Sequence, residues 1–99
     1  MKCHRIDVED GLRLKIEGAL DALTARDIRP IFDQVVAEKP ARVTIDLEAL
    51  TLIDSSGVGA IVSLYKRVKA AGGQLVVVQA QDQPLAVLKL LKLDRLFGL

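Results

Sequence analysis

The start of the chain alternates between apolar and charged residues. Leu12, Leu14 and Ile16 are separated by single charged positions, and this period of two is typical of a strand with one buried face. Residues 6–8 precede this run across Glu9-Asp10-Gly11, and an Asp-Gly pair between two such segments favours a tight turn. The pattern therefore predicts that the chain opens with an antiparallel hairpin.

The next segment has helical spacing. Its apolar residues recur at intervals of three and four, which places them on one face of a helix: Ile28, Ile31, Phe32, Val35 and Val36. We expect Thr24 to cap this helix, with Asp27 completing an acidic variant of the capping box. Pro30 lacks the N–H that would bond to the carbonyl of Arg26, which predicts either a distorted first turn or a regular helix that starts near Pro30. The helix should end before Pro40.

The middle of the chain repeats the change from strand to helix. Val43, Ile45 and Leu47 alternate with polar residues, as expected of a second half-buried strand. A longer helical pattern follows residue 54, and Gly72-Gly73 is typical of the end of such a helix. The predicted buried stripe of this helix consists of Val58, Ile61, Val62, Tyr65 and Val68.

The last part of the chain predicts one more strand and one more helix. The continuous apolar run over residues 75–78 is typical of a strand buried on both faces. A final helix should begin near Pro84 and carry Leu85, Leu88 and Leu91 toward the core. The complete order is strand, strand, helix, strand, helix, strand, helix. It predicts an α/β fold with a mixed sheet and parallel β-α-β crossovers.

Composition removes several classes of function. The net charge of +1 argues against nucleic acid as a partner, because such affinity draws on bulk positive charge. Aromatic residues make up only 3%, so stacking platforms for bases are nearly excluded. No apolar run approaches the roughly 20 residues that span a bilayer, so we expect no direct membrane insertion. The lone cysteine and the absence of a recognisable signal peptide predict a cytoplasmic protein.

Catalytic and metal-binding templates also fail. Cys3 and His4 are the only residues of their kinds, so neither an internal disulfide nor a multi-cysteine zinc site can form. Neither Ser55 nor Ser56 stands in a Gly-x-Ser-x-Gly elbow, and His4 should lie in a frayed terminus. A dinucleotide fingerprint would need a third glycine where Val62 stands. We therefore predict a protein that is not an enzyme and has no cofactor, catalytic residue or metal site.

The segment over residues 54–60, Asp-Ser-Ser-Gly-Val-Gly-Ala, is the most informative one. One interpretation is structural: Asp54 caps a helix and the glycines allow close packing on a sheet. The other is functional: Ser55 is exposed at a helix N-terminus, where a phosphate would meet free N–H groups and the positive end of the helix dipole. Such a phosphate would add about −1.5 to −2 charges beside Asp54, and would repel a docked partner without unfolding the domain.

The chain resembles a known family over nearly its whole length. The matching segments are residues 18–21, 24–25, 43–47, 53–60, 72–73, 87–90 and 93–97. In this order they resemble a bacterial STAS domain, and the group they resemble most is the single-domain anti-sigma-factor antagonists. The resemblance implies one STAS domain over residues 1–99, with an N-terminal hairpin in a mixed sheet and three to four helices.

The same resemblance implies a partner switch. In this family the unphosphorylated antagonist binds an anti-sigma factor that is also a serine kinase, phosphorylation by ATP releases it, and a serine phosphatase restores it. Ser55 matches the phosphorylated position of the family, and Asp21 matches its nearby acidic position. The partner-binding residues that the resemblance implies are Asp21, Asp54, Ser56, Gly57, Val58 and Gly59.

Two rivals to this interpretation stay open. A STAS subunit of a lipid transporter or of a larger signalling assembly would share the fold without a phosphorylation cycle. An enzyme that uses Ser55, or a pair of the carboxylates Asp21, Asp46 and Asp54, is the second rival, although the elbow around that serine is missing. Many relatives continue past residue 99 with a further helix, so we expect Phe97 and Leu99 to be partly exposed.

Overall fold

The N-terminal hairpin predicted from the alternating pattern is present in the structure, a computed structural model that describes residues 1–99. Strand β1 (Lys2–Val8) pairs antiparallel with β2 (Gly11–Leu20), and Ile6 stands opposite Arg13. Strand β1 begins so early that His4 lies within the sheet, where its ring contacts the carboxylate of Glu17. The expectation of a frayed terminus at His4 was therefore wrong.

The remaining elements alternate between helices and strands, and the later strands are parallel. In chain order they are α1 (Thr24–Ala37), β3 (Arg42–Asp46), β4 (Leu50–Ile53), α2 (Ser55–Ala70), β5 (Gln74–Val78) and α3 (Asp82–Leu90). The main sheet has the order β1-β2-β3-β5, and β2, β3 and β5 run parallel to one another. The predicted α/β fold, with its mixed sheet and parallel crossovers, is confirmed.

Strand β4 was not in the predicted order of elements. It pairs parallel with the last residues of β2, where Leu20 stands opposite Ile53. The first half of β2 pairs with β3 instead, so β3 and β4 follow one another along the same edge of β2. Because β2 and β4 end side by side, the helices that follow them begin next to each other.

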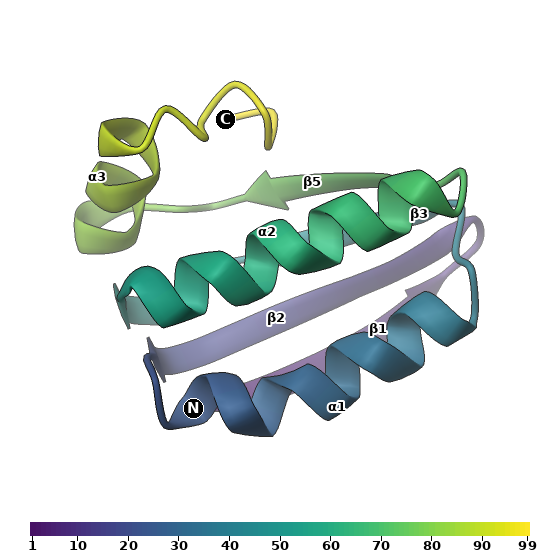
Figure 1. The fold of residues 1–99 in the computed structure, drawn as a ribbon, viewed down its shortest axis with the longest axis horizontal. Helices are drawn as coiled ribbons and strands as arrows, with labels where there is room; N and C mark the ends of the chain where they lie inside the picture. The colour runs from purple at the N-terminus through teal and green to yellow at the C-terminus, as the bar shows by residue number, and fades with distance from the viewer.

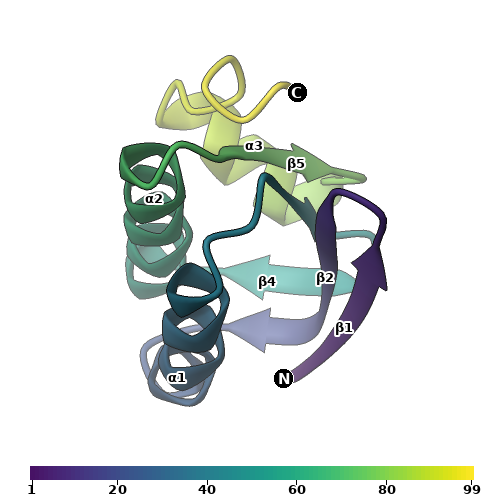
Figure 2. The ribbon, with the colours of Figure 1, turned by 90° about the vertical axis from the view of Figure 1, so that its right-hand side faces the viewer.

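Helices α1 and α2 lie side by side across one face of the sheet, and no helix covers the opposite face of β1 and β2 (Figure 1, Figure 2). The apolar positions of β2 point toward these helices, and Leu14 and Ile16 are fully buried. Helix α1 contributes Ile28 and helix α2 contributes Ile61, both also fully buried. Burying each such side chain stabilises the fold by about 1.5–3 kcal/mol, so this layer holds both helix starts in place.

The beginning of α1 differs from the prediction. The helix runs without a break from Thr24 through the exposed Pro30 to Ala37, so it does not start near the proline. The predicted cap by Thr24 is also wrong, because Thr24 is already helical and no side chain of the N-cap residue Leu23 bonds to the helix. The helix ends before Pro40, as predicted.

In the C-terminal part, Phe97 is more buried and Leu91 is less buried than the sequence predicts. Phe97 was expected to be partly exposed but is fully buried, with its ring edge-on to Tyr65 at 5.7 Å between ring centres. Its carbonyl accepts a hydrogen bond from the N–H of Val77 at 2.9 Å, which ties the tail to the edge strand β5. Leu91 was expected in the core and is 50% exposed, whereas the predicted partial exposure of Leu99 is confirmed.

Strand β5 is less enclosed than its apolar run predicts. It lies at the edge of the sheet, and only Leu75 and Val77, on the helix side, are buried. Val76 and Val78 on the other side are half-buried. Helix α2, which precedes this strand, ends as predicted, with Gly72 in a left-handed conformation (φ 90°) that favours glycine.

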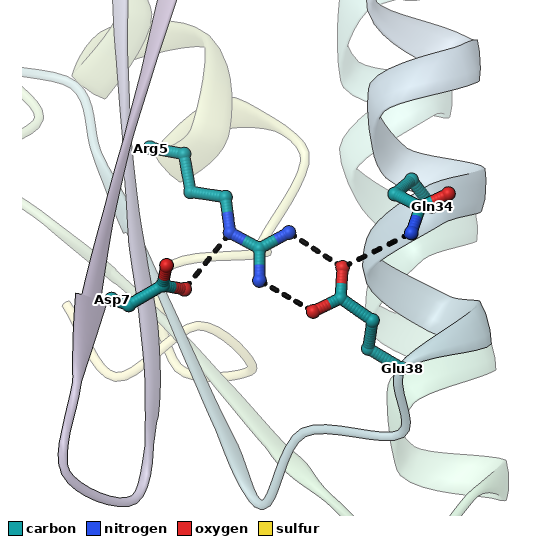
Figure 3. A network of polar contacts seen from close by, with 4 residues as sticks. All are labelled: Arg5, Asp7, Gln34 and Glu38. Atoms are coloured by element: carbon teal, nitrogen blue, oxygen red, sulfur yellow. Dashed lines mark hydrogen bonds and ion pairs between the residues drawn. The ribbon is translucent and has the colours of Figure 1, made fainter.

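An ionic cluster ties β1 to the end of α1 (Figure 3). Arg5 donates two hydrogen bonds to the Glu38 carboxylate, both at 2.6 Å, and a third to Asp7 at 2.9 Å. Gln34 donates to the same Glu38 at 3.4 Å. The bonds with Glu38, and then with Asp7, raise the pKa of Arg5, and Arg5 lowers the pKa of Glu38. Exposed pairs of this kind add little stability because water screens their charges, so the cluster helps to align α1 rather than to drive folding.

Candidate functional site

Asp54 joins the start of α2 to the loop that leads into α1. One of its carboxylate oxygens accepts the N–H of Gly57 at 3.0 Å, which makes Asp54 the N-cap that the sequence indicated. The other oxygen accepts the N–H of Ala22, in the loop after β2, at 3.2 Å. A single carboxylate therefore fixes the relative position of both helix starts. Ser55, the first residue of α2, makes no side-chain hydrogen bond and is exposed.

Asp21 organises the start of α1 in a similar way. Its carboxylate accepts the N–H groups of Leu23 and Thr24, both at 3.0 Å. The hydroxyl of Thr24 lies within 3.1 Å of the same carboxylate, donates to the carbonyl of Ala19 at 2.8 Å and accepts the N–H of Asp21 at 2.9 Å. The Thr24 N–H bond is the main cause that lowers the pKa of Asp21, with further contributions from the Thr24 hydroxyl and the Leu23 N–H. Asp21 thus takes the role that the sequence assigned to Thr24, because its carboxylate reaches both free N–H groups.

Gly57 and Val58 belong to the packing between α2 and the sheet. A β-carbon built on Gly57 would lie 2.3 Å from the carbonyl oxygen of Leu20 and 2.8 Å from a side-chain carbon of Ile53. Val58 is 6% exposed. Both residues face the core, so their implied role in partner binding stays a prediction, one that would act through the position of the helix.

Gly59 and Ser56 are placed differently. Nothing lies within 4 Å of the point where a β-carbon of Gly59 would stand, and the residue is exposed. Ser56 is half-buried on the flank of the helix. Ser55, Gly59 and Ser63 follow one another at intervals of four, so they form one row along the exposed side of α2. Within the 54–60 segment, this row contributes the exposed residues Ser55 and Gly59.

The electrostatics of the helix start favour an added anion. The first turn of α2 carries no acidic side chain, and its leading N–H groups have no carbonyl partners within the helix. The aligned peptide dipoles add about half a positive charge at this end. A phosphate on Ser55 would meet this positive end on one side and the carboxylate of Asp54 on the other.

Sequence reasoning missed Gln83 in helix α3. Its side-chain oxygen accepts the N–H of Ile53 and its side-chain nitrogen donates to the carbonyl of the same residue, both at 2.9 Å. Ile53 is the last residue of β4, directly before Asp54. The side-chain amide of Gln83 therefore bonds to the end of β4 as a neighbouring strand would. It fixes the backbone that leads into Asp54 and Ser55. No local pattern could have revealed this role, because it depends on how α3 packs against β4.

Two other kinds of site are not found. No group of three or more histidine, cysteine, aspartate or glutamate side chains is placed to hold a metal ion. None of the helices has the length and apolar character that crossing a membrane requires.

The fold and the site together define an α/β domain that presents an exposed serine at the start of a helix, directly after the capping carboxylate of Asp54. The model of the STAS domain family matches residues 5–99. The chain therefore belongs to the STAS domain family, which confirms the resemblance seen in its sequence.

Comparisons with individual proteins agree with this assignment. The anti-sigma F factor antagonist of Paenibacillus polymyxa is 30% identical over 67 residues, which make up 67% of this chain and 57% of that protein. A Thermotoga maritima protein solved by crystallography is 26% identical, with a TM-score of 0.86 over 94% of this chain and 80% of that one. The Bacillus cell fate determinant SpoIIAA, in its phosphorylated form, is 19% identical, with a TM-score of 0.77 over 95% of this chain and 86% of that one.

Proposed function

We propose that this protein is an anti-sigma-factor antagonist whose binding is switched by phosphorylation of Ser55. In its unphosphorylated form it binds an anti-sigma factor that is also a serine kinase. Transfer of the γ-phosphoryl group of ATP to the Ser55 hydroxyl releases ADP and ends the complex, and a serine phosphatase restores the hydroxyl. The similarity to the Paenibacillus polymyxa antagonist supports this role, and the exposed, uncommitted hydroxyl of Ser55 is the observation that carries it.

Exposure favours Ser55 over its neighbour as the phosphorylated residue. Ser55 is exposed at the helix tip, whereas Ser56 is half-buried. A kinase must draw the acceptor hydroxyl into its own active site, which an exposed side chain outside the core allows with little cost. The solved phosphorylated form of SpoIIAA has the same fold, in keeping with a switch that leaves the domain folded.

The surroundings of Ser55 explain how a phosphate would break a complex without unfolding the domain. Asp54 supplies the cap of α2, so the helix does not depend on the Ser55 hydroxyl. The phosphate adds about −1.5 to −2 charges to a surface that already carries Asp54 and, through the Ala22 loop, Asp21. A partner that approaches this surface then meets both bulk and like charge.

The same geometry supports a proposal for the partner surface. We place its centre on Ser55 and Gly59, with Ser56, Asp21 and Asp54 around them, while Gly57 and Val58 hold the helix from beneath. The protein acts by binding in the cytoplasm, where an anti-sigma factor has its client, and supplies no catalytic group of its own.

Phosphosite mapping tests this function. The protein is incubated with a purified anti-sigma serine kinase from the same organism and MgATP, and the phosphorylated residue is located by tandem mass spectrometry. We expect one phosphate on Ser55, none on the Ser55→Ala variant, and normal phosphorylation of the matched Ser56→Ala control. Binding without phosphate on either serine would contradict the switch and favour a STAS domain held permanently in a larger assembly.

A further inference from the structure

A groove runs between α1 and α2, directly beyond Ser55. Its volume is about 310 Å³, and its floor consists of the buried side chains of Phe32, Ala60 and Leu64. Gly59 and Ser63 form the wall on α2. Ser55 lies four residues, about 6 Å of helix rise, before Gly59 in the same exposed row, so it stands close to the groove without lining it.

The rim of the groove is positively charged. Arg29 on α1 is exposed and makes no hydrogen bond or ion pair. Arg67 on α2 donates to Asp33 on α1 at 2.7 Å, so the rim carries two guanidinium groups against one carboxylate. A guanidinium without a counter-ion matches a carboxylate through two parallel hydrogen bonds. The complement of this rim is therefore an acidic side chain.

Gly59 gives a partner access to the groove. The open space around its missing β-carbon lets another backbone or a small side chain approach the helix closely. A β-carbon at this position would meet no atom of this chain within 4 Å, so the fold does not require the glycine for packing. Gly59 lines the groove together with the buried Ala60.

We propose that this groove is the docking site for an acidic segment of the partner kinase, with a carboxylate of that segment bound to Arg29 and its backbone lying over Gly59. This proposal rests on the proposed function and adds to it the reason for release. A phosphate on Ser55 would stand about one helical turn from Gly59, on the same exposed side of α2. Its charge has the same sign as the docked segment and therefore expels it.

Affinity measurements on matched variants test the proposal. The kinase that phosphorylates Ser55 is titrated calorimetrically against the wild type, Arg29→Glu, Gly59→Gln and the control Lys89→Glu. Lys89 is an exposed residue of α3 outside the groove, so its reversal changes the net charge by the same amount. We expect Arg29→Glu and Gly59→Gln to weaken binding by about tenfold or more and Lys89→Glu by less than about twofold. Urea unfolding of each variant confirms that the domain is folded.

A photo-crosslinking residue at Ser63 identifies the occupant directly. We expect a crosslink to a kinase segment that contains aspartate or glutamate. A crosslink to an uncharged or basic segment, a crosslink to a second copy of this chain, or no crosslink at all would overturn the proposal. So would near-wild-type affinity of both groove variants, in which case phosphorylation of Ser55 would still leave the proposed function standing. A kinase that binds but never phosphorylates Ser55 would overturn both.

Discussion

The two sides of the first turns of α2 differ in how closely they pack, although both come from the short segment over residues 54–60. Gly57 lies so close to β2 that its missing β-carbon would stand 2.3 Å from the carbonyl oxygen of Leu20. Two residues later, the missing β-carbon of Gly59 would touch nothing within 4 Å. Ser55 shares the open side with Gly59. The helical period therefore divides the 54–60 segment into residues that serve the fold and residues that are free to bind.

This division would let the proposed switch act on a small domain without unfolding it. The residues that hold α2 against the sheet are buried and apolar, such as Val58 and Ile61. The residue proposed to be modified contributes neither packing nor the helix cap, which comes from Asp54. Chemistry at Ser55 can therefore change what binds while the folding free energy stays nearly constant.

The largest effect expected from this contrast is that of Gly57→Ala. The added methyl group collides with backbone that cannot move without separating α2 from β2, so we expect a loss of about 3 kcal/mol of unfolding free energy. Urea denaturation measures this loss. A Gly57→Ala variant as stable as the wild type would show that α2 is not seated as described.

The next effect concerns the cap. Asp54→Ala removes the acceptor of the Gly57 and Ala22 N–H groups, and we expect it to cost about 1–2 kcal/mol. Asp54→Asn keeps a side-chain oxygen and should cost clearly less. Thermal unfolding of the three proteins side by side gives the comparison, and equal losses for alanine and asparagine would argue against capping.

On the open side of α2, a glycine-to-alanine substitution should raise the unfolding free energy instead of lowering it. Gly59→Ala adds a methyl group in free space and reduces the freedom of the unfolded chain, so we expect a gain of about 0.5–1 kcal/mol. Chemical denaturation under the conditions used for Gly57→Ala measures it. A loss of stability would mean that the open side also contributes to packing.

A charged residue at the proposed switch should be nearly neutral for folding. We expect Ser55→Asp to change the unfolding free energy by less than about 0.5 kcal/mol, because Ser55 is exposed and makes no side-chain bond. The same variant should bind the kinase more weakly, whereas Ser55→Ala should bind and resist release. Unfolding of the domain by Ser55→Asp would instead favour the purely structural interpretation of the motif.

The smallest effect on stability is expected at Asp21, and only at acid pH. Hydrogen bonds lower the pKa of Asp21 below its unfolded value of about 3.9. A lowered folded-state pKa gives stability that is complete above the unfolded pKa and is lost as the pH falls through the folded one. Asp21→Asn should therefore flatten the decline of stability below about pH 4. An unchanged pH profile of the unfolding midpoint would contradict the capping role of Asp21.

Local patterns in the sequence predicted the elements that local physics determines. The hairpin follows from alternation around Asp10-Gly11, and the end of α2 follows from Gly72. Strand β4 has four residues and no alternation that sets it apart, so its existence depends on the free end of β2. The burial of Phe97 likewise depends on Tyr65, which is distant in the sequence.

The candidate site was predictable to a similar extent. The cap by Asp54 and the exposure of Ser55 follow from residue types at a helix start, and the structure has both. The role of Asp21 was assigned to Thr24, because the sequence does not show which of two competing side chains reaches the free N–H groups. The bonds from Gln83 to Ile53 and the groove beside Arg29 form between separate elements, so no local pattern predicts them.

The most direct test of the account compares the phosphorylated and unphosphorylated protein in two measurements on the same samples. After complete phosphorylation at Ser55, affinity for the kinase is measured by calorimetry and Tm by thermal unfolding. We expect affinity to fall by about tenfold or more while Tm moves by less than about 4 °C. Unchanged affinity, or a fall in Tm as large as that of Gly57→Ala, would contradict a switch that acts on binding and spares the fold.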